Sequence, residues 1–147
     1  MISLLLSISE LTFAKKVVIG KNCYELDSKT MTAKLTFFDK NSKICSDCYL
    51  NAVDIPEVVE YKGKNYTVTE IGADCFWRNL DKLQGFSALS RPGLTITIPK
   101  TIEHIEEKAF VFRDIIEFKI DPNSPYFTLK DNILYDKSFT KAICACD

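Results

Sequence analysis

The residues best suited to chemistry are six cysteines and a single histidine. Cys45 and Cys48 have the C-x2-C spacing of a zinc knuckle or a redox pair, and Cys144 and Cys146 form a C-x-C pair. Four thiolates can hold zinc, but zinc ribbons usually carry two C-x2-C pairs on tight, often glycine-containing turns. The two pairs here lie far apart, without such turns. We therefore favour structural or incidental cysteines, and a small metal-binding or thiol redox module remains the alternative.

Catalysis has little support in the sequence. A Ser-His-Asp or Cys-His triad would have to use His104. The neighbours Ile102 and Ile105 take the buried positions, so His104 is predicted to face solvent. The pair Glu106–Glu107 is interpreted as charges at a helix start. The chain contains no GxSxG, phosphate-binding glycine loop or HExxH motif. We expect no enzymatic activity and no cofactor.

The elements that would position these residues form a repeat. A seven-residue pattern occurs three times, as LNAVDIP at 50–56, GLTITIP at 93–99 and IIEFKID at 115–121. Apolar residues alternate in each copy, which is typical of a strand with one buried face: Val53 and Ile55, Ile96 and Ile98, Phe118 and Ile120. The first two copies are followed by IGADCF at 71–76 and IEEKAF at 105–110. The spacing within these phrases predicts short helical turns that pack behind the strands.

Together these motifs resemble the BspA-type leucine-rich repeat of surface proteins in some bacteria and parasitic protists. The resemblance covers residues 50–121, about half of the chain. It implies an α/β fold, namely a short leucine-rich-repeat solenoid with parallel strands, short helices and β-hairpin insertions and caps. Asp121 stands where the family usually has proline, and Cys75 stands where it usually has alanine. Cys75 is most simply a small core residue.

A single domain is expected from 147 residues. Residues 1–14 read either as a short secretory signal or as an N-terminal cap. Residues 15–49 are predicted to form an N-terminal hairpin cap, residues 50–121 the repeats, and residues 122–147 a C-terminal hairpin cap that keeps the solenoid monomeric. A further hairpin, centred on Gly63, is expected to project from the solenoid.

Charge and hydropathy exclude two classes of partner. The net charge is −1, and no basic stripe suited to nucleic acid is present. No apolar run approaches the ~20 residues of a membrane helix. The sequence therefore favours a non-catalytic protein-interaction or adhesion module. The family resemblance implies secretion or display at the cell surface, with a host or extracellular-matrix protein as partner.

Two groups of residues are predicted to bind that partner. The first comprises outward-facing strand residues on the concave face of the solenoid. The second lies on the projecting hairpin, where tyrosine contributes contact area at low entropic cost. The alternative is that both hairpin tyrosines pack the hairpin onto the solenoid. The strand group is Asp54, Thr95, Thr97, Glu117 and Lys119, and the hairpin group is Tyr61, Lys62, Lys64 and Tyr66.

Overall fold

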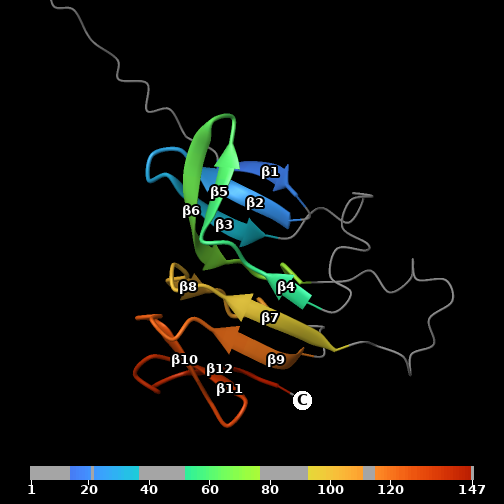
Figure 1. The fold of residues 1–147 in the computed structure, drawn as a ribbon, viewed down its shortest axis with the longest axis vertical. Helices are drawn as coiled ribbons and strands as arrows, with labels where there is room; N and C mark the ends of the chain where they lie inside the picture. The colour runs from blue at the N-terminus through green and yellow to red at the C-terminus, as the bar shows by residue number, and fades with distance from the viewer. Residues whose placement is uncertain (1–13, 21, 37–51, 77–92, 111–114, 147) are drawn as a thin grey trace, which may run out of the picture.

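The computed structural model describes residues 14–20, 22–36, 52–76, 93–110 and 115–146, which form strands arranged in three sheets (Figure 1). The first sheet has the order β1-β2-β3-β6-β5, and β8 also pairs with β6. The second has the order β4-β7-β9 and the third β10-β11-β12. Buried residues of all three sheets form one hydrophobic cluster.

The three repeat strands form the middle sheet, as the sequence predicts. They are β4 (Ala52–Asp54), β7 (Leu94–Ile98) and β9 (Ile115–Ile120), and both pairings are parallel. Val53, Ile96 and Phe118 lie opposite one another in register and are all buried. The alternating apolar residues therefore mark the inner face of a parallel sheet, which stacks one strand per repeat.

The phrases that follow the strands form turns, and the expectation of helices is wrong for the described residues. Residues 73–76 and 107–110 are turns, and β8 (His104–Ile105) precedes the second of them. Only one turn separates each isoleucine from its phenylalanine, which is too short for the successive hydrogen bonds of a stable helix. Phe76 and Phe110 are nevertheless equivalent core residues, with stacked rings whose centroids lie 5.6 Å apart.

The predicted hairpin around Gly63 is confirmed, but it does not project from the core. It consists of β5 (Val58–Tyr61) and β6 (Lys64–Ile71), joined where Lys62 and Gly63 have φ angles of 51° and 74°. Positive φ at both central residues is typical of a type I′ turn. β6 also pairs in parallel with β3 (Thr32–Thr36). The hairpin thus extends the sheet begun by β1 (Lys15–Ile19) and β2 (Asn22–Asp27).

The C-terminal segment forms the predicted antiparallel strands, namely β10 (Phe127–Lys130), β11 (Ile133–Asp136) and β12 (Ala142–Ala145). Phe127 and Leu134 bury their side chains in the common core. The strands follow a turn in which the Ser124 N–H donates to the Asp121 carbonyl at 2.9 Å. The Ile102 N–H donates in the same way to the Pro99 carbonyl at 3.3 Å. Asp121 therefore preserves the turn that proline makes in the preceding repeat.

Two sequence expectations lie outside the described residues. These are the secretory signal or cap at 1–14, of which only Ala14 is described, and the pair Cys45 and Cys48. The domain limits at 15–49, 50–121 and 122–147 remain predictions. Within them, the structure describes strands at 15–36 and at 127–145.

Candidate binding surface

The outward side chains of β4, β7 and β9 form two straight rows. Asp54, Thr97 and Lys119 are register partners across the three strands, and Thr95 lies beside Glu117 in the next row. Successive side chains of a strand point to opposite faces, so these residues lie on the face opposite the buried Val53–Ile96–Phe118 row. The structure therefore brings all five predicted strand residues together on one surface.

The rows carry charges that a partner can reach. The Thr97 hydroxyl donates to the Asp54 carboxylate at 2.6 Å. The Lys119 ammonium lies 3.7 Å from the Glu117 carboxylate, and these two side chains are 60% and 53% exposed. An ion pair this exposed is weak because water screens it. Both charged side chains can therefore leave this ion pair and contact a partner with little loss of free energy.

The hairpin residues form a second group, well away from the first. In Figure 1 the tip between β5 and β6 lies at the far end of the first sheet from β4, β7 and β9. Lys62 and Lys64 are exposed there. The ring of Tyr61 is half-buried and lies under the ammonium groups of Lys15 and Lys62, at 5.4 and 5.7 Å from its centroid.

Tyr66 does not belong to this surface, which corrects the expectation that it contacts a partner. It is 4% exposed and packs in the core, with its hydroxyl 3.5 Å from the Ser28 hydroxyl. The physical reason is that the pairing of β6 with β3 joins the hairpin to the first sheet, so the side of β6 that carries Tyr66 and Val68 packs into the common hydrophobic cluster. The hairpin part of the candidate surface is therefore Tyr61, Lys62 and Lys64.

Sequence reasoning missed the role of Glu106. Its carboxylate accepts the Ala73 N–H at 2.8 Å and pairs with the Lys34 ammonium at 3.0 Å. The Ala73 hydrogen bond, followed by that of Lys34, lowers the pKa of Glu106, and the bond to Glu106 raises the pKa of Lys34. Glu106 thus links successive layers instead of starting a helix. The only local sequence signal for this role is the alignment of Ile71-Gly-Ala with Ile105-Glu-Glu, which places Glu106 where the preceding repeat has Gly72.

The four described cysteines fall into a buried pair and a partly buried pair. Cys23 and Cys75 are buried, and burial raises the pKa of both thiols, so they stay protonated near neutral pH. Cys75 is therefore a core residue, as predicted. Cys144 and Cys146 are partly buried on or beside β12. Within the described ranges, no three His, Cys, Asp or Glu side chains gather as metal ligands would. His104 is exposed, as predicted.

Comparison with solved structures identifies the class of fold. The chain is similar to a leucine-rich cell surface protein from Faecalibacterium prausnitzii A2-165, with a TM-score of 0.51 and 21% identity, over 76% of this chain and 24% of that chain. It is also similar to a leucine-rich-repeat protein from Bacteroides capillosus, with a TM-score of 0.52 and 24% identity, over 76% of this chain and 69% of that chain. The pneumococcal vaccine antigen PcpA matches with a TM-score of 0.54 and 19% identity, over 76% of this chain and 28% of that chain. The chain therefore has a leucine-rich-repeat fold.

This result confirms, at the level of the fold, the resemblance to BspA-type repeats. The chain spans 24% of the Faecalibacterium protein's length and 28% of the pneumococcal antigen's. Neither protein-family models nor curated proteins give a match to the sequence. The structural neighbours do not favour a metal or redox module. Across the part of the chain that the structure describes, no helix is long and apolar enough to cross a membrane.

Proposed function

We propose that this chain is a non-catalytic protein-binding or adhesion module, and that the outward face of β4, β7 and β9 is its contact surface. The observation that carries the proposal is the alignment of Asp54, Thr97 and Lys119 in one outward-facing row, in which both charged residues are exposed. Charges held at fixed spacing on a rigid sheet favour one orientation of a complementary partner. The sheet itself is held by buried aliphatic residues beneath the row.

The neighbours support a location outside the cell. One is described as a cell surface protein and another as a vaccine antigen. On this basis we propose that the chain acts as a monomer, secreted or displayed at the cell surface. Its partner would be a host or extracellular-matrix protein. The Tyr61–Lys62–Lys64 tip would serve as a separate, smaller contact.

Charge reversal on the strand surface tests this proposal. The purified chain is passed over immobilised fibronectin and laminin by surface plasmon resonance. We expect Asp54→Lys and Lys119→Glu each to weaken binding by about fivefold or more, since each loses an attraction of ~1 kcal/mol and adds a repulsion. Lys29→Glu is the matched control, because Lys29 is exposed in the turn after β2.

The outcomes separate the two parts of the proposal. If all three variants bind as the parent does, the strand face is not the contact surface. If the parent binds neither protein, the matrix partner is wrong. Circular dichroism of each variant shows whether the fold is retained.

A further inference from the structure

Besides the β4–β7–β9 sheet, the repeats contain a second series of parallel strand pairs, which runs from β3 through β6 and ends at β8. Leu35, Ile71 and Ile105 are successive register partners in β3, β6 and β8. At each step a backbone bond joins the layers: the Gly72 N–H donates to the Leu35 carbonyl at 2.7 Å, and the Glu106 N–H to the Ile71 carbonyl at 2.9 Å. β8 pairs with no other strand in the described segments. Since strand residues direct their backbone groups alternately to the two edges, the Ile105 carbonyl lies on the unpaired edge.

Two further N–H groups occupy equivalent positions in successive layers. The Ala73 N–H donates to the Glu106 carboxylate at 2.8 Å, and the Asp74 N–H donates to the Lys108 carbonyl at 3.0 Å. In the last layer Glu107 and Lys108 occupy the positions of Ala73 and Asp74. Their N–H groups, like the Ile105 carbonyl, have no hydrogen-bonding partner among the described residues. An edge with free donors and acceptors is a template for another strand.

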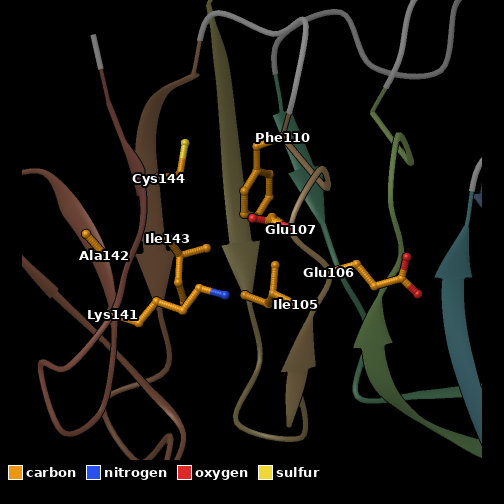
Figure 2. A pocket seen from close by; sticks show the side chains of 8 residues that line it. All are labelled: Ile105, Glu106, Glu107, Phe110, Lys141, Ala142, Ile143 and Cys144. Atoms are coloured by element: carbon orange, nitrogen blue, oxygen red, sulfur yellow. The ribbon is translucent and has the colours of Figure 1, made fainter.

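A cleft lies beside this edge. It has a volume of about 330 Å³, and residues 105–107 and 141–144 line its two sides (Figure 2). Consecutive strand residues point to opposite faces, so a wall made of four successive residues indicates that β12 presents its edge to the cleft. β12 is also the last strand of its sheet. The cleft is therefore bounded by one edge of β8 and one edge of β12, and neither edge pairs with another strand among the described residues.

The side chains of the cleft combine an apolar floor with one available cation. Ile105, Phe110 and Ile143 provide the apolar part, and Figure 2 shows the Lys141 side chain extending across towards Ile105. Lys141 forms no ion pair with any described residue. Glu106 points away from the cleft in Figure 2, consistent with its pairing with Lys34. Glu107 also lines the cleft and is exposed, so the negative charge that the cleft favours is one placed beside Lys141, next to an apolar group.

We propose that this cleft binds an extended segment of a partner protein, which adds a parallel strand to β8 and carries an aliphatic residue followed directly by an acidic one. The aliphatic side chain continues the Leu35–Ile71–Ile105 row. The carboxylate of the partner's acidic residue accepts a hydrogen bond from the Glu107 N–H and forms an ion pair with Lys141. This hydrogen bond repeats the one that the Glu106 carboxylate accepts from the Ala73 N–H. Backbone bonds give such strand addition its affinity, and the side chains give its specificity. This site does not depend on the β4–β7–β9 surface.

A synthetic peptide tests the proposal. The probe is capped His-Ile-Glu-Glu-Lys-Ala, the sequence of residues 104–109, which carries one aliphatic–acidic pair. Binding is followed by fluorescence anisotropy and by amide NMR of the full chain. We expect saturable binding, with shifts and slower exchange at the Glu107 and Lys108 amides.

Matched variants make the result specific. Lys141→Glu should weaken binding by about three- to tenfold, as expected for loss of a partly desolvated ion pair. Lys137→Glu, in the exposed turn that precedes β12, should not. A peptide with Gln in place of the first residue of its Glu-Glu pair should bind the parent more weakly than the unmodified peptide does, and its binding should depend much less on Lys141→Glu. The proposal is overturned by absence of binding, by equal effects of the two lysine variants, or by a self-associated dimer that already protects both amides.

Discussion

The stacked pair Phe76 and Phe110 offers the sharpest test of the repeat structure. Phe76 is fully buried, and its ring lies parallel to that of Phe110 within 11°. Phe110 in turn meets Phe118 edge-on at 5.1 Å. Replacing Phe76 with alanine removes a ring that is enclosed on every side. We expect Phe76→Ala to lower the free energy of unfolding by about 3–5 kcal/mol, a large share of the ~5–15 kcal/mol of a typical domain.

The pairwise contact gives a second, independent magnitude. An aromatic pair contributes about 0.5–1.5 kcal/mol beyond the area it buries. Phe76→Ala and Phe110→Ala each remove that contribution, but the double variant removes it only once. The double variant should therefore cost less than the sum of the two single variants by about this amount.

Urea unfolding followed by circular dichroism measures these differences. At about 2–4 °C per kcal/mol for a chain of this size, Phe76→Ala should also lower Tm by roughly 6–20 °C. Phe139→Ala is the control, because Phe139 is 53% exposed and its ring lies beside the Tyr135 ring and the Lys130 ammonium. Its cost should be below about 1 kcal/mol. Equal costs for Phe76→Ala and Phe139→Ala would refute the stacked-layer arrangement.

Three further predictions follow from the described contacts. Glu106→Gln should reduce the free energy of unfolding by about 1 kcal/mol at neutral pH. Because folding lowers the pKa of Glu106, this difference from the parent is present above the unfolded pKa and should vanish as pH falls through the folded pKa. Urea unfolding midpoints of both proteins, measured over a series of acid pH values, would reveal it. Deleting residues 60–67 should abolish cooperative unfolding, since it removes Tyr66 and part of β6, and a sharp thermal transition would contradict this. Truncation after Asp121 should give dimers or aggregates by light scattering, because it uncovers the core that Phe127 and Leu134 close, and a stable monomer would disprove the capping role.

Local patterns in the sequence were sufficient to predict most strands. Alternating apolar residues identified the buried Val53, Ile96 and Phe118, because a strand's side-chain period depends only on its own backbone. Turn residues mark two of the hairpins: Gly63 between β5 and β6, and Asp131 and Asn132, which adopt φ angles of 51° and 59°, between β10 and β11. These features arise from contacts between residues close in the chain.

The candidate surface was predictable in part for the same reason. Asp54, Thr97 and Lys119 follow from alternation alone, since the residues between buried positions must face outward. The sequence did not reveal which element would cover the second face of the hairpin. Tyr66 shares its side of β6 with Val68, and in the folded chain both side chains are buried in the common hydrophobic cluster.

The sequence by itself therefore determined which segments are strands, which side of each is apolar, and that they repeat. Only the tertiary structure decided that the hairpin joins the N-terminal sheet, that Glu106 ties one layer to the layer before it, and that β8 and β12 leave a cleft between their edges. The physical reason is that an apolar pattern requires burial without specifying the covering element. Pairing between distant strands is set by the packing of the whole core.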